Sequence, residues 1–516
     1  MRRSLLALVL AACNQPAGDD SDSAASGGSS DTTTTGADIG STSTMPTGDT
    51  SVPDTGDAPA PVCPDGDVVL VDQDDVLLHA GCTDYPGDLT IQYTVTDIAP
   101  LAGIRTVAGT LTIGTIGWEG SLTTLDPLAS LESVGGLDVA MLPIGDLLAF
   151  SNLTEIPGDL AIFGLDFPSL EGFHNITTVG GEVDISISDV SDLTGLRSLQ
   201  RVGKRLSLSN LAIPDFHGLE ALTELGIAGG EPARFSVSSL PVTSLADLNF
   251  PWHDAIDVSL YNTGISDLGA LAGVPELHGL EIIDNDALAD LIGLESLRRI
   301  GGVLKIQSNA ALVDLDALGG LESVGELQLV GDDFADLEVF ASLHTIGTLF
   351  VQSFKGVELP PPPALQTIGA ATFLACHDLT GLAILGGVVS LTSLSLDRND
   401  ALVDLSALAG LIEVTGELMI HENAALATVG DLAALQTVGG RLVIVINPSL
   451  PQAEAAAWGD AIDVGGVRKI AGNKDPGPPL DPCPWFEDGE CDEPINGSGI
   501  CGEDLDGDDC CPGFCE

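Results

Sequence analysis

Apolar and polar residues alternate along this chain in a phrase that returns every 22 to 24 residues. The phrase reads apolar-x-apolar-x-x-Asn-x-x-Leu-x-x-Leu, and its clearest copy runs from Leu304 to Leu315. Alternation at period two predicts a short strand with one buried and one solvated face. A repeat of this length predicts a solenoid, because one coil cannot bury its apolar side without neighbours above and below.

The repeats are defined by the first residue of each strand. In the second half of the chain these residues are Leu280, Leu304, Leu327, Leu349, Ala371, Leu394, Leu418 and Leu442. The first half carries the period less regularly, with strand starts at Leu89, Leu111, Leu137, Leu160, Val183 and Leu206. We therefore expect a mainly β solenoid of right-handed β-helix or leucine-rich-repeat type.

One polar position per coil, just after the strand, predicts a ladder inside the solenoid. An amide there can donate to and accept from the backbone of adjacent coils, which satisfies buried polar groups. The predicted ladder residues are Asn285, Asn309, Asn399, Asn423 and Asn447, with Cys376 at the same position and Asn210 and Asn262 after strands one residue shorter. We interpret Cys376 as a buried structural thiol rather than a nucleophile.

The rest of each coil, its return side, also repeats. Leu-x-x-Leu-x-x-Val, as from Leu318 to Val324, predicts one helical or 3₁₀ turn. The Gly residues that follow are expected to permit positive φ where the chain bends into the next strand.

The period is interrupted at residues 228–257, which contain Phe250-Pro251-Trp252. This segment is interpreted as an insertion, or as a junction between a first solenoid block at 63–227 and a second at 258–474 with a C-terminal cap.

The N-terminus has the features of an export signal. Arg2 and Arg3 precede a short apolar run, and Leu10-Ala-Ala-Cys13 resembles a bacterial lipobox. The resemblance implies that residues 1–12 are removed and that acylated Cys13 anchors the protein in a bilayer, at the outer membrane or cell surface of a bacterium. The alternative is an ordinary secretory signal in which Cys13 has no special role.

Residues 13–62 continue this anchor as a tether. After Cys13 they are rich in Ser, Thr, Asp, Gly, Pro and Ala, with eight Asp and no Lys or Arg. Such a composition buries too little apolar surface to fold, so a disordered spacer is expected.

The remaining cysteines indicate an oxidising compartment. Cys63 and Cys82 flank the start of the solenoid, where one disulfide would close its open end. The acidic tail at 475–516 holds an even set of six, which leaves several pairings open: Cys483, Cys491, Cys501, Cys510, Cys511 and Cys515.

Carboxylates in this tail alternate as in chains that wrap Ca²⁺. The candidate ligands are Asp488, Asp492, Asp504, Asp506 and Asp508, and their segment resembles the calcium-binding repeat of Notch receptors. The alternative is an acidic disulfide knot without metal, and no other cofactor is expected.

The repeat phrase, the Val-Gly-Gly returns at Val134 and Val179, and the closing run from Trp458 to Asn473 resemble the receptor L domain family. These leucine-rich, β-helix-like domains occur in insulin- and EGF-receptor ectodomains and in bacterial surface proteins. The resemblance covers residues 83 to 473. It implies a ligand-binding or adhesive extracellular module, and it carries over no catalytic residue.

Charge excludes two classes of partner. The chain has 76 acidic and 17 basic residues, for a net charge of -59. Nucleic acid and a bare anionic membrane are therefore poor partners. The eight His follow no metal-ligand spacing, and neither a Gly-x-Ser-x-Gly nor a Walker-type motif occurs, so we expect no enzyme.

Binding is expected on the outward strand positions, which form one continuous surface. The candidates are Lys305, Gln307, Gln328, Phe350, Gln352, Asp397, Arg398, Met419, His421 and Glu422. Their mixed chemistry favours an extracellular protein or glycan ligand. The favoured function is a surface-anchored recognition or adhesion lipoprotein; the alternatives are an envelope protein without a specific ligand and a polysaccharide-acting β-helix enzyme.

Overall fold

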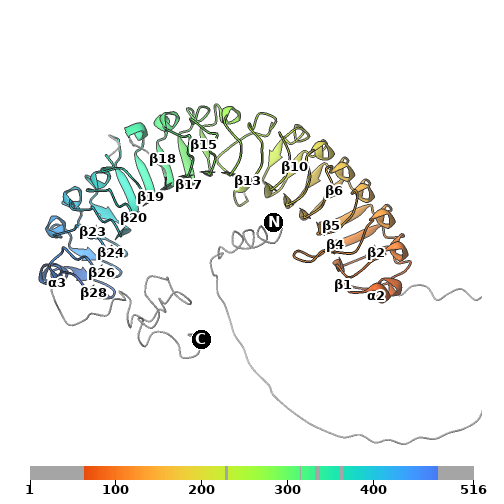
Figure 1. The fold of residues 1–516 in the computed structure, drawn as a ribbon, viewed down its shortest axis with the longest axis horizontal. Helices are drawn as coiled ribbons and strands as arrows, with labels where there is room; N and C mark the ends of the chain where they lie inside the picture. Colours follow the sequence, from red (N-terminus) through yellow and green to blue (C-terminus); the bar gives the residue numbers. More distant parts are fainter. Residues whose placement is uncertain (1–62, 227–229, 314, 332–337, 361–363, 475–516) are drawn as a thin grey trace, which may run out of the picture. The chain divides into compact units, whose positions relative to one another are not determined.

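The computed structural model describes residues 63–226, 230–313, 315–331, 338–360 and 364–474 (Figure 1). The expected signal segment with Cys13, the tether, the six tail cysteines and the five calcium candidates lie outside the described residues. No helix within the described ranges is long and apolar enough to cross a membrane.

The fold is a mainly β solenoid, as predicted. Each coil adds one strand to a sheet in which all neighbouring strands run parallel (Figure 1). The strands follow one another in the order β1 (Val68–Leu70), β3 (Leu89–Ile91), β4 (Thr106–Gly114), β5 (Ser133–Ala140), β7 (Leu160–Phe163), β9 (Glu182–Ser186), β11 (Arg205–Ser209), β13 (Ala233–Ser238), β14 (Ile256–Tyr261), β16 (Gly279–Ile283), β17 (Arg299–Gln307), β18 (Ser323–Val330), β19 (Thr345–Gln352), β20 (Thr367–Leu374), β22 (Ser393–Asp397), β24 (Leu418–His421), β26 (Leu442–Val445) and β28 (Arg468–Ala471).

Coils also pair through shorter strands at the end of the return side, which the sequence did not predict. Two of them join the main sheet: β2 (Asp84–Tyr85) beside β4 and β15 (Glu276–Leu277) beside β17. The others form two small parallel sheets, β6 (Glu155–Ile156), β8 (Thr178–Val179), β10 (Arg201–Val202) and β12 (Glu224–Leu225), and β21 (Ser390–Leu391), β23 (Glu413–Val414), β25 (Thr437–Val438) and β27 (Asp463–Val464).

Single 3₁₀ turns occupy the return side, on the opposite side of the coils from the main strands (Figure 1). They are η1 (Ala99–Leu101), η2 (Asp126–Leu128), η3 (Leu148–Phe150), η4 (Glu171–Phe173), η5 (Thr194–Leu196), η6 (Gly269–Leu271), η7 (Asp316–Gly320), η8 (Glu338–Phe340), η9 (Ala383–Leu385), η10 (Ser406–Leu408) and η11 (Gly430–Leu432). The α-helices of the described chain are α2 (Gln73–Leu78) in the first coil and α3 (Gln452–Asp460) in the last.

The predicted strand starts share one register. Leu280 pairs with Leu304, and Leu304 with Leu327 in turn. The start residues and the apolar residues two places on are buried, so one continuous core runs through the coils. At roughly 1.5–3 kcal/mol for each fully buried aliphatic side chain, this core is the main source of stability.

The main sheet continues from β11 through β13 to β14, across the interruption that the sequence suggests at 228–257. β13 pairs with β11 on one side and with β14 on the other, so this segment does not separate two blocks. The coil between β11 and β13 is longer than its neighbours, and its extra residues fall outside the paired strands. Phe250 and Trp252 then pack against Phe235, at ring-centroid distances of 5.9 and 5.4 Å.

Most glycines that end the return side do not serve the expected purpose, although Gly226 has a φ of 94°. Gly325, Gly347 and Gly369 are not at positive φ. A Cβ on Gly347 would lie 2.3 Å from the carbonyl oxygen of Gly325 in the preceding coil, and a Cβ on Gly369 would lie 2.3 Å from that of Gly347. These glycines are required because the coils stack too closely for a side chain.

Positive φ is found instead at the residue just after most main strands. Asp284, Ser308, Ser353, Arg398 and Glu422 have φ between 51° and 55°. This left-handed position turns the chain so that the next residue points into the solenoid. In most coils of the second half that next residue belongs to the ladder.

The ladder links each coil to the one before it. The Asn423 Oδ1 accepts from the backbone N–H of Asn399 at 3.1 Å, and its Nδ2 donates to the Leu396 carbonyl at 2.9 Å. The same pattern involves Asn285, Asn309, Asn399, Asn447 and Asn473, all buried. Cys376 is buried at the same position, with its thiol 3.6 Å from the carbonyls of Val351 and Leu374.

The prediction that Asn210 and Asn262 belong to this ladder is wrong. They occupy the left-handed position, with φ of 52° and 50°, which Asn tolerates better than most residues. Their strands are not shortened. In the second of these coils the ladder position is held by buried Thr263, whose hydroxyl donates to the Asn285 Oδ1 at 2.6 Å.

The two ends of the solenoid are closed differently. A disulfide joins Cys63 to Cys82 with Cα atoms 5.5 Å apart, in agreement with the sequence prediction. At the other end Trp458 of α3 packs against the core, and its indole N–H donates to the Leu432 carbonyl at 3.3 Å.

Candidate functional site

The outward-facing residues of four consecutive strands, β17 to β20, form the sheet-face patch. Parallel register sets them in two rows across the strands. The patch consists of Lys305, Gln328, Phe350 and Thr372 in one row and Gln307, Val330, Gln352 and Leu374 in the other. All eight are half-buried.

Most polar side chains of this patch form no hydrogen bond with the rest of the described chain. Within the described chain, the side chains of Lys305, Gln307 and Gln352 form no hydrogen bond, whereas that of Gln328 donates to Glu326. Val330 lies between Gln307 and Gln352 in one row, and Leu374 ends that row. Phe350 supplies apolar surface in the other row. Aromatic and apolar surface mixed with available donors and acceptors is typical of protein interfaces.

The candidates nearer the C-terminus lie differently from what the sequence predicted. Asp397 and His421 do occupy outward positions of β22 and β24, but both are buried. Arg398 and Glu422 follow at the left-handed positions, and Met419 is half-buried on β24. Asp397 and His421 are therefore part of a packed polar cluster and not free surface.

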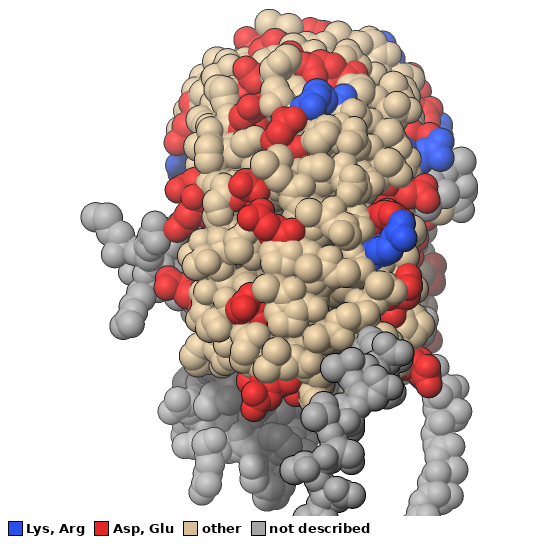
Figure 2. Space-filling view, turned by 90° about the vertical axis from the view of Figure 1, so that its right-hand side faces the viewer, with Lys and Arg blue, Asp and Glu red and all other residues tan. Residues whose placement is uncertain are grey.

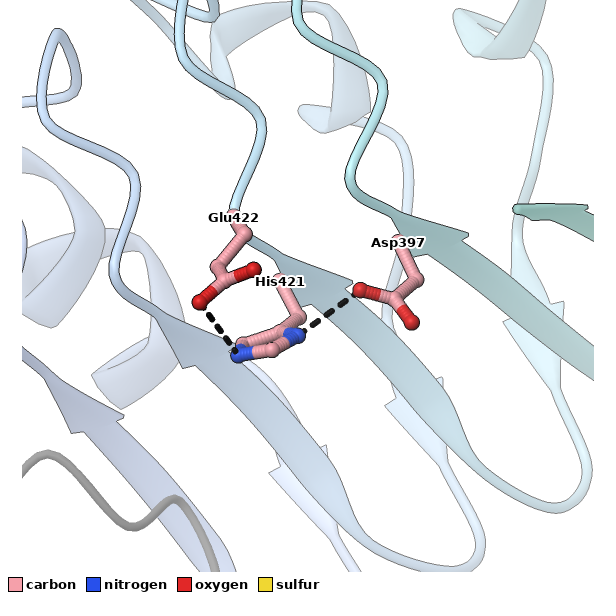
Figure 3. Close-up of side chains that lie close together, drawn as sticks. All are labelled: Asp397, His421 and Glu422. Atoms are coloured by element: carbon pink, nitrogen blue, oxygen red, sulfur yellow. Dashed lines mark hydrogen bonds and ion pairs between the residues drawn. The ribbon is translucent and has the colours of Figure 1, made fainter. Parts of the chain in front are cut away.

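This cluster joins Asp397, His421 and Glu422 (Figure 3). The Asp397 Oδ1 lies 2.8 Å from the His421 Nδ1, and the Glu422 Oε1 lies 3.8 Å from the Nε2 on the other side of the ring. The guanidinium of Arg398 lies 3.4 Å from the Asp397 Oδ2. Among the described residues, this is the group whose imidazole and carboxylates come close enough together to hold a metal ion.

Two acidic residues that the sequence analysis missed lie on the same face of the sheet in the first half. Asp138 of β5 and Asp184 of β9 flank Ala161 of β7 in register. Burial raises the pKa of both carboxyls, and the charge of Asp184 raises that of Asp138 further. The Asp184 Oδ1 is buried without a hydrogen-bond partner among the described residues. Both residues could have been found from the sequence, because they occupy outward positions of regular strands.

We expect Asp184→Asn to stabilise the protein at neutral pH. A carboxyl whose pKa is raised on folding favours the folded state only below its unfolded pKa, and this contribution is lost as the pH rises through the folded value. The gain in melting temperature should therefore be present at pH 7 and vanish below about pH 4, near the unfolded pKa.

Asp404→Asn is the control, because the opposite change in stability is expected for it. The Ser406 hydroxyl and backbone N–H lower the pKa of Asp404, so its substitution should destabilise the protein at pH 7. An equal response of both variants to pH would contradict this interpretation of Asp184.

Comparisons with known proteins give structural matches only. No protein-family model matches the chain, and no curated protein matches it significantly. An internalin (InlF) of Listeria monocytogenes is 16% identical with a TM-score of 0.32, over 68% of this chain and 85% of that one. A leucine-rich-repeat protein of Leptospira interrogans is 13% identical with a TM-score of 0.36, over 76% and 91%.

The functional domain of InlJ from Listeria monocytogenes, described as including a cysteine ladder, is 14% identical with a TM-score of 0.32, over 73% and 72%. At these scores the matches carry no argument about function.

Proposed function

We propose that this protein is a non-catalytic recognition protein that binds a partner protein through the sheet-face patch. The observation that carries the proposal is that apolar Phe350, Val330 and Leu374 share one sheet face with Gln307 and Gln352, whose side-chain amides form no hydrogen bond within the described chain. Parallel pairing repeats this surface on successive strands about 4.8 Å apart. A partner can thus contact several coils at once.

Charge supports a protein partner over nucleic acid. Acidic side chains are scattered over the side of the solenoid that Figure 2 shows, with few Lys or Arg among them. This is the side of the N-terminal coils and not the sheet-face patch. Together with the net charge of -59, such a surface repels polyanions. Lys305 is the patch's own cation, so the rest of the patch is neutral.

Phe350→Asp is expected to weaken partner binding at least about 30-fold, because aromatic anchors at interface centres are worth about 2 kcal/mol or more. The matched control is Val313→Asp, at a return-side residue that is 76% exposed. The partner used is a surface protein that the wild type captures and that, once purified, competes for the same binding. The measurement is the affinity of each purified variant for this partner. Equal loss in both variants, or in neither, would assign recognition to another surface or favour a purely structural envelope role.

We further propose that acylated Cys13 anchors the protein at the bacterial surface. The disulfide between Cys63 and Cys82 supports export to an oxidising compartment. Cys13→Ser should move the protein from the membrane fraction to the soluble fraction of cells, while Cys376→Ser should leave it in the membrane. Retention of the Cys13→Ser variant in the membrane would rule out this anchor.

A further inference from the structure

Asp397, His421 and Glu422 combine two kinds of ligand in one small volume. Asp397 and His421 are register partners on β22 and β24, so their side chains leave the same face of the sheet. Their side chains are only 8% and 4% exposed. Imidazole nitrogen and carboxylate oxygen are both ligands of Zn²⁺ and related ions.

Their spacing suits one ion. One ligand atom from each residue can be chosen so that all lie within 4.8 Å of one another. A tetrahedral ion with bonds of about 2.0–2.2 Å holds its ligands about 3.3 Å apart. The Asp397–His421 contact of 2.8 Å needs to open only slightly, with the metal replacing the hydrogen between the two atoms.

Glu422 can move toward a bound ion, and its exposure also gives the ion a path into the site. Its side chain is 42% exposed, so the carboxylate can rotate toward the imidazole without disturbing the core. The same exposure leaves an entry path for the ion, which a metal site requires. The Arg398 guanidinium contacts the Oδ2 of Asp397, and the Oδ1 of the same carboxylate faces His421.

Other His–Asp pairs in this chain show what is specific here. His278 lies 2.7 Å from Asp257, and His377 lies 2.8 Å from Asp400. Both pairs are more exposed, and neither belongs to a group of three potential ligands within the described chain. A His–Asp contact between coils is therefore a recurring structural feature, and the burial and the third carboxylate distinguish the cluster at His421.

We propose that Asp397, His421 and Glu422 form a binding site for one divalent transition-metal ion of the zinc type. Water or a group of a bound partner completes the coordination. This site adjoins the sheet-face patch, because Asp397 is the register partner of Leu374. The binding of the ion does not depend on the recognition proposed above.

The test titrates metal-free, fully oxidised full-length protein with Zn²⁺ by calorimetry and with Co²⁺ by its ligand-field absorption. Oxidation keeps the tail cysteines from acting as thiolate ligands. We expect one site with nitrogen and oxygen ligands. His421→Ala should weaken metal binding about 100-fold. Loss of a residue that only hydrogen-bonds to a metal ligand costs up to about 100-fold, and His421 would itself be a ligand. His278→Ala should leave metal binding unchanged.

Glu422→Gln gives a second measurement at a half-exposed position that folding tolerates, and it should weaken the site in the same direction. If His421→Ala fails to fold, this variant decides the question. Binding that is equal in the wild type, Glu422→Gln and His278→Ala, or a cobalt spectrum that does not change on binding, would overturn the proposal.

Discussion

Asn423→Ala is expected to lower the free energy of unfolding by about 2–4 kcal/mol. The substitution removes the acceptor for the backbone N–H of Asn399 and the donor to the Leu396 carbonyl, both inside the solenoid. Water cannot replace these partners, since Asn423 is fully buried. Chemical denaturation of the purified protein measures the loss.

Asn175→Ala is the matched control for this variant. Asn175 also donates to the carbonyl of the preceding coil, to Ser151 at 2.8 Å, but from an exposed position. Water can satisfy the groups it leaves, so a change within about 0.5 kcal/mol is expected. A similar cost for both variants would mean that the ladder adds no more than surface hydrogen bonds.

Gly347→Ala should be the second strongly destabilising change, by about 1–3 kcal/mol or more. The added Cβ would lie 2.3 Å from the Gly325 carbonyl oxygen, and backbone cannot give way without separating two coils. Thermal unfolding followed by circular dichroism gives the shift in melting temperature.

Gly145→Ala separates this clash from the general effect of replacing glycine. A Cβ added to Gly145 would meet no other atom within 4 Å, and this residue is not at positive φ. We expect this variant to be neutral or slightly stabilising, because alanine reduces the entropy of the unfolded chain. Destabilisation of equal size at both positions would refute the stacking explanation.

Most of the fold could be predicted from the spacing of a few apolar residues. Leu304 and Leu327 are register partners because every coil has the same inward strand position, and a shift of one residue would expose the whole apolar row. The ladder residues could be found for the same reason. A buried polar residue recurs where each coil must satisfy the same backbone groups.

Other features were missed because they depend on contacts between coils. Glycines such as Gly347 suggested a backbone turn, whereas the structure explains them by the distance to the preceding coil. Asn262 was mistaken for a ladder residue, since Asn suits both a left-handed position and a buried amide position. The burial of Asp397 and His421 depends on their tertiary surroundings, which period-two alternation does not encode.

The residues proposed to act were thus only partly predictable. The sheet-face patch could be placed by alternation alone, because Phe350 and Gln352 must point outward if Leu349 and Val351 point inward. The proposed metal site could not be predicted in this way. It requires that the end of one strand, the end of the next strand and the turn after it bring three side chains together. Sequence spacing places these residues at one edge of the sheet, but it does not predict the directions of their side chains.

The long coil before β13 carries a consequence for how this protein can vary. Its extra residues leave the pairing of β11, β13 and β14 unchanged, so length differences are absorbed outside the strands. Each strand depends only on its two neighbours, as in other repeat architectures. Duplication or loss of one whole repeat should thus preserve the remaining core, so the length of the solenoid can change without redesigning the fold.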